Sequence, residues 1–202
     1  NAVMTESLQE PSSAHPFGTD KLGRDLLSRV IFGTRTSLIM TLCLVAVIFV
    51  IGTFLGVIAG YFGGVVDAVI MRVSWTKYAR LARSMVLKVK KSLYIEAAIV
   101  NGTKTWKILL VHILPNMVTQ MVVTAAADIG TMMLELASLS FLGFGATAPT
   151  PEWGLMLNEG RTYMAKAPWL MIYPGIAIVI CVVVFNMLGD SIRDVLDPRQ
   201  DQ

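Results

Sequence analysis

The chain is poor in charged residues. Only 15% of its 202 residues are charged, whereas 54% are hydrophobic; a soluble domain usually carries about 25% charged residues. The apolar residues also form long runs, so lipid rather than water is expected to surround much of the chain. The net charge of +3 therefore matters less than the positions of the basic residues.

Residues that build reactive or metal-binding sites are also scarce. Cys43 and Cys181 lie in apolar runs, where we expect small buried side chains rather than a disulfide or a metal site. His15 and His112 are isolated, and no Ser/His/Asp or Cys/His set is apparent. We therefore predict no catalytic residue and no metal site, and we do not expect the chain itself to be an enzyme.

A phosphate-binding loop of the form G-x-x-x-x-G-K-[ST] is absent, and the stretch Asn101–Lys104 does not match it. Such a loop holds ATP phosphates on backbone N–H groups. We therefore expect the chain to bind no cofactor, and any ATP-driven process would use ATP and Mg held by another subunit. No nucleic-acid partner is expected.

Three apolar stretches are long enough to cross a bilayer, which takes about 20 helical residues. We predict membrane spans at about 37–61, 116–141 and 169–188. Pro115 suits the first turn of the second span, because its missing N–H would have no partner there in any case. Lipid is accordingly an expected partner of the chain.

Glycines recur along the first predicted span. Gly52, Gly56 and Gly60 stand four residues apart. At helical spacing they form one smooth face, which predicts that another helix packs closely against this span.

The first 35 residues form a polar segment ahead of the membrane domain at 36–202. Within this segment, Leu22–Arg35 carries apolar residues at helical spacing together with three arginines. We expect a short amphipathic helix that lies on the membrane surface, with its arginines among the lipid headgroups.

The stretch after the first span is strongly basic and fixes the predicted topology. It contains a single acid, Glu96, against eight basic residues: Lys77, Arg80, Arg83, Lys88, Lys90, Lys91, Lys104 and Lys107. This excess marks a cytoplasmic loop at 77–115, which makes 143–168 an external loop and 189–202 a cytoplasmic tail. The arginines before Thr36 disagree, because the same parity places them outside.

The basic loop contains a predicted short helix from about Leu93 to Asn101. Ser92 is a suitable N-cap, and Glu96 falls near the positive end of the helix. Gly102 can adopt the left-handed conformation that ends a helix. The sequence therefore predicts a stiff element of about two turns inside the loop.

At this helix the sequence resembles the EAA motif of permease subunits in bacterial ABC importers. The resemblance rests on Glu96-Ala97-Ala98, then Gly102, then Ile113-Leu114-Pro115. It implies a coupling helix that fits a cleft on an ATPase subunit and transmits its closure to the pore. The residues assigned to coupling are Tyr94, Glu96, Ala97, Ala98, Gly102, Ile113, Leu114 and Pro115.

Other stretches narrow the resemblance to the C-type permease subunit of dipeptide, oligopeptide and nickel systems. They are distributed over most of the length of the chain and are His15–Asp25, Gly33–Leu38, Leu139–Gly145, Pro149–Gly154 and Gly189–Arg199. The resemblance implies an all-α polytopic bundle in the bacterial inner membrane. It also implies a paralogous permease subunit as heterodimer partner, two ATP-binding subunits and an extracytoplasmic substrate-binding protein.

The chain departs from this family pattern in two places. The family's first membrane helix is absent before Asn1, and roughly two further helices are absent between Val73 and Ser74. Loss of a whole hairpin preserves the topology deduced above. We expect these residues to have been left out of the sequence, because a true deletion would remove helices that line the pore.

Acidic residues inside the second span suggest a transport pathway. Asp128 and Glu135 stand two helical turns apart on nearly one face, with Met132 one turn from each. Carboxylates at membrane depth usually face the bundle interior or a water-filled path; the alternative is that helix-packing neighbours satisfy them. The pattern Asp128 to Met133 looks like nickel-type members, which favours nickel or a metal chelate slightly over peptides.

Two other classes of function remain open. An ion- or proton-coupled carrier that works alone would show inverted repeats and discontinuous helices, which the sequence does not display. A membrane scaffold without transport activity would leave the acids of the second span without a purpose.

Overall fold

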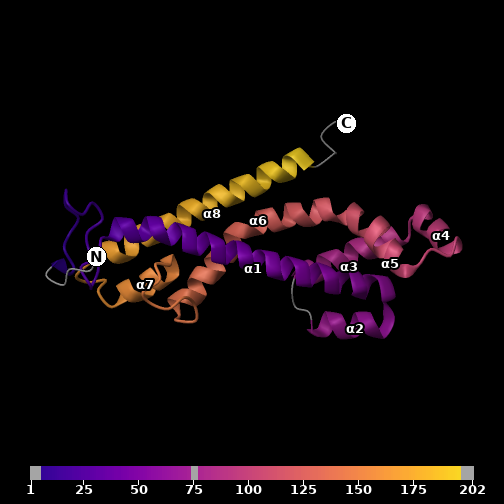
Figure 1. Ribbon diagram of the computed structural model, residues 1–202, viewed down its shortest axis with the longest axis horizontal. Coiled ribbons are helices and arrows are strands. Elements are labelled where there is room, and N and C mark those ends of the chain that lie inside the picture. Colours follow the sequence, from indigo (N-terminus) through magenta and orange to yellow (C-terminus); the bar gives the residue numbers. More distant parts are fainter. Residues whose placement is uncertain (1–5, 74–76, 197–202) are drawn as a thin grey trace. The chain divides into compact units, whose positions relative to one another are not determined.

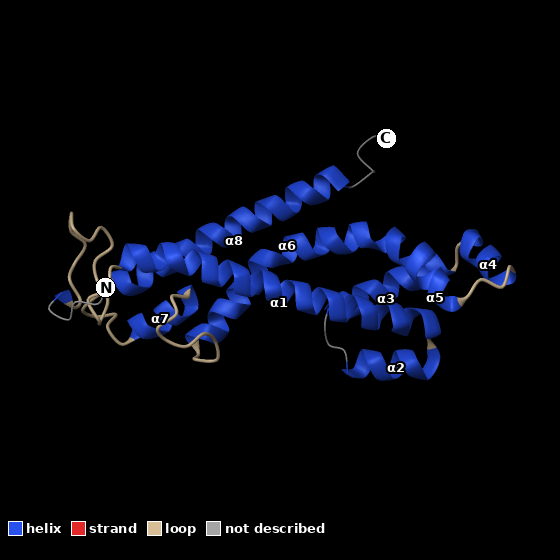
Figure 2. Ribbon diagram, in the orientation of Figure 1, coloured by secondary structure: helices blue, strands red, loops and turns tan. Residues whose placement is uncertain are grey.

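The structure is a computed structural model that describes residues 6–73 and 77–196. Within these ranges the chain is helical apart from turns and one isolated β-bridge between Thr19 and Asp25 (Figures 1 and 2). The elements in chain order are α1 (Leu26–Phe62), α2 (Gly64–Val73), α3 (Lys77–Lys90), α4 (Leu93–Val100), α5 (Thr105–Lys107), the π-helix η2 (Ile108–Ile113), α6 (Leu114–Phe141), α7 (Trp153–Arg161) and α8 (Trp169–Leu196).

Among the described residues, three helical stretches are long and apolar enough to cross a membrane. They are Leu26–Phe62, Thr105–Phe141 and Trp169–Val195. Each contains one of the predicted spans, so the predicted all-α membrane fold with three spans is confirmed.

The chain divides into two compact units. Unit 1 comprises the described parts of Asn1–Cys43 and Ala127–Leu188, and unit 2 those of Leu44–Ala126 and Gly189–Gln202. The helices α1, α6 and α8 each continue from one unit into the other.

In unit 2, α1 packs against α3 with no space for side chains at two glycines. A Cβ atom on Gly56 would lie 2.4 Å from the carbonyl oxygen of Ala79, and one on Gly60 would lie 2.8 Å from the Cβ atom of Val86. The close helix contact predicted from the glycine spacing is confirmed at these two positions.

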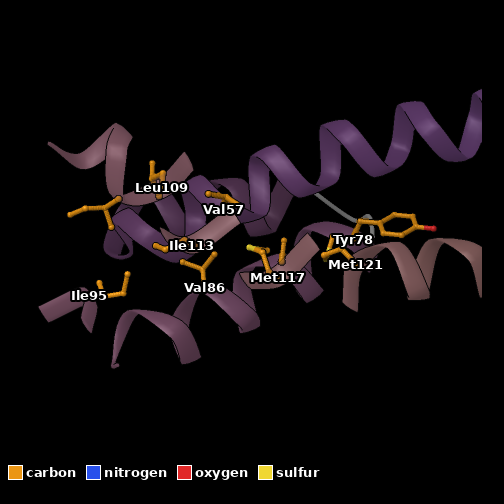
Figure 3. Packing of buried hydrophobic residues seen from close by; sticks show 10 residues of the cluster. Val57, Tyr78, Val86, Ile95, Leu109, Ile113, Met117 and Met121 are labelled. Carbon is orange, nitrogen blue, oxygen red and sulfur yellow. The ribbon is translucent and has the colours of Figure 1, made fainter. Parts of the chain in front are cut away.

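The core of unit 2 joins five elements. It is built by ten buried apolar residues from α1, α3, α4, η2 and α6 (Figure 3): Val57, Tyr78, Ala82, Val86, Ile95, Ile108, Leu109, Ile113, Met117 and Met121. Lipid chains are as apolar as these side chains, so inside a bilayer close packing rather than exclusion of water holds such a core together.

In unit 1, α7 connects the first and second spans. The indole N–H of Trp153 donates to the carbonyl oxygen of Val30 on α1, at 2.9 Å, and a Cβ atom on Gly33 would lie 2.9 Å from the Trp153 ring. On α6, the carbonyl oxygen of Ala137 would lie 2.5 Å from a Cβ atom on Gly154. The glycines therefore let α7 sit directly against both long helices.

The surface helix predicted over Leu22–Arg35 is not a separate element. α1 begins at Leu26 and continues unbroken into the first span. The Asp25 carboxylate accepts a hydrogen bond from the Ser28 amide at 2.8 Å and so caps its start. The prediction divided one helix into two because the pattern of charged residues changes at Thr36. The backbone hydrogen bonding of the helix continues through this position.

The second and third spans begin or end beyond their predicted limits. Pro115 lies in the first turn of α6, as predicted, but the chain is already helical from Thr105 through α5 and η2. The preceding π-helix has wider turns than an α-helix, which suits a residue that has no N–H to donate. α8 extends to Leu196, so the first part of the predicted polar tail is helical; residues 197–202 lie outside the described residues.

Candidate coupling helix and pathway face

α4 is a two-turn helix that its own subunit barely covers. Its single buried side chain is Ile95, and Ala98 is half-buried. Leu93 and Val100, at its two ends, are 83% and 86% exposed. Exposed apolar surface of this kind marks contact sites for other proteins or for membranes.

The C-terminal end of α4 is closed by a turn that requires glycine. Gly102 has a φ of +71°. Its N–H donates to the carbonyl oxygen of Ile99, and the N–H of Thr103 donates to that of Ala98, both at 3.0 Å. This pair of hydrogen bonds is the Schellman motif. The left-handed, helix-ending conformation predicted for Gly102 is therefore confirmed.

The start of α4 differs in one detail from the prediction. Ser92 occupies the N-cap position, but its hydroxyl donates to the carbonyl oxygen of Val89 at 2.5 Å and makes no capping hydrogen bond. The serine therefore fastens α4 to the end of α3 rather than closing the first turn of α4.

Two contacts join α4 to the second span. The Tyr94 hydroxyl accepts a hydrogen bond from the Asn116 side chain on α6, at 2.9 Å. Ile95 is fully buried in the same core as Ile113 of η2 and Met117 of α6 (Figure 3). One hydrogen bond and one shared apolar cluster therefore join α4 to the beginning of α6.

The remaining residues assigned to coupling are also brought together in unit 2. Glu96 and Ala97 are exposed on α4. Leu114 is half-buried and Pro115 is exposed at the start of α6. Glu96 and Ala97 are thus accessible on the surface of α4, whereas Ile113 lies in the core.

The three candidate pathway residues differ in accessibility. Glu135 is exposed, Asp128 is half-buried, and Met132 is buried with 8% exposure. Of the three, Glu135 is the exposed one, and one carboxylate oxygen of Asp128 is buried.

The comparison with known protein families identifies the family to which the chain belongs. Residues 21–202 match the family described as binding-protein-dependent transport system inner membrane component. The chain belongs to this family. It is a permease subunit, a multi-pass protein of the bacterial inner membrane, and proteins of this kind are not themselves enzymes.

Relatives of this permease come from several transport systems. The glutathione transport system permease protein GsiD of Pectobacterium atrosepticum is 42% identical, over 94% of this chain and 74% of the relative. The dipeptide transport system permease protein DppC of Alkalihalophilus pseudofirmus is 38% identical, over 95% and 74%. The nickel transport system permease protein NikC of Escherichia coli K12 is 35% identical, over 95% and 82%.

These relatives contain residues that the permease chain lacks. The alignment with the glutathione permease runs over 223 residues, although the chain has 202, so at least 21 of its positions hold no residue of this chain. The hairpin missing after Val73 stays a prediction, because its junction with Ser74 lies outside the described residues.

Ion pairs in unit 1 involve Arg24 and Arg29, two of the three arginines that the predicted topology places outside. The Asp20 carboxylate accepts hydrogen bonds from Arg24 at 2.6 Å and from Arg29 at 2.7 Å. Arg29 also donates to Glu159 on α7 at 3.0 Å. These pairs place acidic partners beside Arg24 and Arg29, and the Arg29–Glu159 pair joins the start of α1 to α7. The predicted topology stays a prediction.

Hydrogen bonds favour the ionised forms of Asp20 and Asp25 in the N-terminal segment. Burial alone would raise the pKa of Asp20, but the amides of Arg24 and Leu22 and the Arg24 guanidinium outweigh it, so the pKa lies below its usual range. The pKa of Asp25 is lowered in the same way, because the Ser28 hydroxyl and amide outweigh the effect of burial.

Two residues of the coupling region were missed by sequence analysis. Ile95 anchors α4 and Asn116 bonds to Tyr94. Ile95 carries a weak signal, because a two-turn helix needs some buried anchor among its apolar residues. Asn116 carries none, since its partner stands 22 residues away in the sequence.

Proposed function

We propose that α4 docks into a cleft on an ATP-binding subunit and passes the movement of that subunit to α6. One observation carries this proposal: α4 exposes almost all of its apolar surface and keeps a single buried anchor, Ile95. A helix serving only its own fold would turn more of its apolar side chains inward. The surface of α4 instead suits a partner with an apolar cleft.

The route of the movement follows the contacts of α4. Ile95 shares a core with Ile113 and Met117, and Tyr94 is hydrogen-bonded to Asn116. From there the second span continues without interruption to Phe141. A rigid displacement of α4 would therefore shift the helix that carries Asp128 and Glu135.

The partners follow from the family. The permease works with ATP-binding subunits and with a substrate-binding protein. We infer that there are two ATP-binding subunits, that they hold the ATP and Mg, and that this chain binds no cofactor itself. The pathway would lie between this chain and a paralogous permease subunit, as in a heterodimer.

We infer that the transported molecule is a short peptide. The relatives at 42% and 38% identity are named for glutathione and for dipeptides, whereas the one named for nickel is 35% identical. The preference for nickel depended on a pattern that includes Met132, which is buried. Vesicles with the whole transporter should take up a labelled dipeptide in an ATP-dependent way. Uptake of labelled nickel with no uptake of peptide would contradict this inference.

Docking of α4 can be tested with a matched pair of substitutions. Val100 on α4 and Val195 on α8 are 86% and 84% exposed. Val100→Asp should reduce co-purification of the ATP-binding subunits severalfold, because it places a charge against an apolar cleft. Val195→Asp should leave co-purification unchanged. Equal recovery of the ATP-binding subunits with both variants would show that α4 is not the docking element.

A further inference from the structure

A stripe of polar side chains runs along α6. Its members are Gln120, Thr124, Asp128, Thr131, Glu135 and Ser138. Successive members stand three or four residues apart, which is the spacing of a single helix face. The term polar stripe denotes these six residues below.

The polar stripe is as long as the apolar part of a membrane is thick. From Gln120 to Ser138 it extends about 27 Å, at a rise of about 1.5 Å per residue. The hydrocarbon core of a bilayer is about 30 Å thick. The stripe therefore runs across the membrane rather than marking one end of the span.

Most of the stripe is uncovered in this chain. Gln120, Thr131, Glu135 and Ser138 are exposed, and Thr124 and Asp128 are half-buried. The hydroxyl of Thr124 donates to the backbone carbonyl of Gln120 at 2.9 Å, and that of Ser138 donates to the carbonyl of Leu134 at 2.7 Å. These two hydroxyls are satisfied by their own helix, whereas the amide of Gln120 and the carboxylate of Glu135 reach outward.

Lipid is a poor environment for this surface. An ionisable side chain at the centre of a bilayer is costly, and so is an amide without partners. Met117, Met121 and Met133 on α6 are by contrast buried, and the buried polar residue Ser140 lies near the end of the helix, outside the stripe. α6 thus buries these methionines and leaves most of the polar stripe exposed.

We propose that the polar stripe forms the wall of the transport pathway in this subunit, and that it selects for positively charged and zwitterionic groups. Its side chains offer two carboxylates, an amide and hydroxyls, and no cation. Such a wall accepts hydrogen bonds from an ammonium group and repels an isolated anion. The inference rests on the proposed transport of peptides, which carry an ammonium group, but not on the docking of α4.

The stripe residues missed by sequence analysis extend the pathway beyond the two acids. Gln120 lies on the cytoplasmic side of Asp128 in the predicted topology, and Ser138 lies on the external side of Glu135. The wall therefore offers polar contacts along the whole crossing, so the cargo would not have to leave water at a single narrow point.

Accessibility of introduced cysteines tests the proposal in the complete transporter. With Cys43 and Cys181 replaced by serine, the test variants are Gln120→Cys, Thr131→Cys and Ser138→Cys. The controls are Val122→Cys on α6 and Val179→Cys on α8, whose side chains are 43% and 61% exposed but stand among apolar residues. The probes are two small thiosulfonates of similar size, one with a trimethylammonium group and one with a sulfonate.

The stripe cysteines should react with both probes, and the two control cysteines should react at least about tenfold more slowly because lipid or protein covers them. At Thr131→Cys the cationic probe should react about fivefold faster than the anionic probe, and Glu135→Gln should remove most of that preference. Stripe cysteines that react no faster than the controls would overturn the proposal, since a partner subunit or lipid would then cover this face. Equal rates for the two probes would overturn the charge preference. Neither result depends on whether Val100→Asp disturbs docking.

Discussion

At the scale of single residues, Gly102 shows how one backbone angle defines the coupling helix. A residue with a Cβ atom in the left-handed conformation is disfavoured by roughly 1–2 kcal/mol. Steric overlap would not disfavour a side chain at Gly102, because a Cβ atom there would have no neighbour within 4 Å. The cost of a substitution should therefore come from the φ of +71° alone.

Gly102→Ala should loosen the end of α4. The amide of Thr103, which donates to Ala98, should exchange with solvent about tenfold faster, as a loss of roughly 1.4 kcal/mol implies. Hydrogen exchange of the transporter in lipid nanodiscs measures this directly. Gly102→Asn is the matched control, because asparagine tolerates the left-handed region, and it should exchange nearly as slowly as the natural residue. Equal exchange in all three proteins would mean that the turn does not hold the helix end.

Residue types also explain which site residues could be found from the sequence. Gly102 and Glu96 carry recognisable signals, since a turn needs glycine and an acid favours the start of a helix. The hydrogen bond between Tyr94 and Asn116 depends on how the chain returns from α4 to α6. No local pattern encodes such a pairing.

At the scale of elements, the N-terminal segment and α7 depend on ionised acids. The pKa of folded Asp20 lies below its usual range. The stability that this group contributes is therefore fully present above its unfolded pKa, about 3.9, and is lost as the pH falls through the lower folded value. The segment should be firmly held at neutral pH and should loosen only in strong acid.

The amides of Leu22 and Arg24 report on this contact, because both donate to the Asp20 carboxylate, at 2.8 and 2.9 Å. Their protection from hydrogen exchange should be constant from pH 7 to about 5 and should fall below about pH 4. Asp20→Asn should lower the protection and flatten its dependence on pH. The amide of Ser28, which donates to Asp25, should still lose its protection from hydrogen exchange in acid in this variant. Unchanged protection of Leu22 and Arg24 in the variant would contradict the role given to Asp20.

Elements were predictable from the sequence where one force dominated. The three spans follow from hydrophobicity alone, and the contact between α1 and α3 follows from glycine spacing. The boundaries differ where hydrogen bonding continues past a change in composition, as at Arg35 in α1 and at Pro115 after η2. The helix α7 lay in a stretch rich in glycine and proline, and it forms because Glu152 caps its first turn, accepting from the amides of Gly154 and Leu155 at 2.8 Å.

At the scale of the whole molecule, two regions of one long helical stretch have different proposed roles. Near its beginning, the stretch Thr105–Phe141 contacts α4 through Ile113 and Asn116. Farther along, it carries the polar stripe. In the proposed mechanism, α6 links the contact with α4 at its beginning to the polar stripe farther along the same helix.

The most direct test of this account is the amount of cargo transported per ATP hydrolysed when the anchor of α4 is shortened. Ile95 is fully buried, so Ile95→Ala should open a gap, at a cost of about 2–5 kcal/mol, and uncouple α4 from η2 and α6. Ile95→Val should give an intermediate effect, and Ile180→Ala, at a 57% exposed position on α8, should give none.

The measurement uses purified transporter in vesicles, with labelled dipeptide uptake and ATP hydrolysis followed together. For Ile95→Ala we expect the ATP-binding subunits to remain bound and to hydrolyse ATP, while the peptide taken up per ATP falls at least about fivefold. An unchanged ratio of peptide to ATP in a complex that retains its ATP-binding subunits would contradict the transmission of movement through α4.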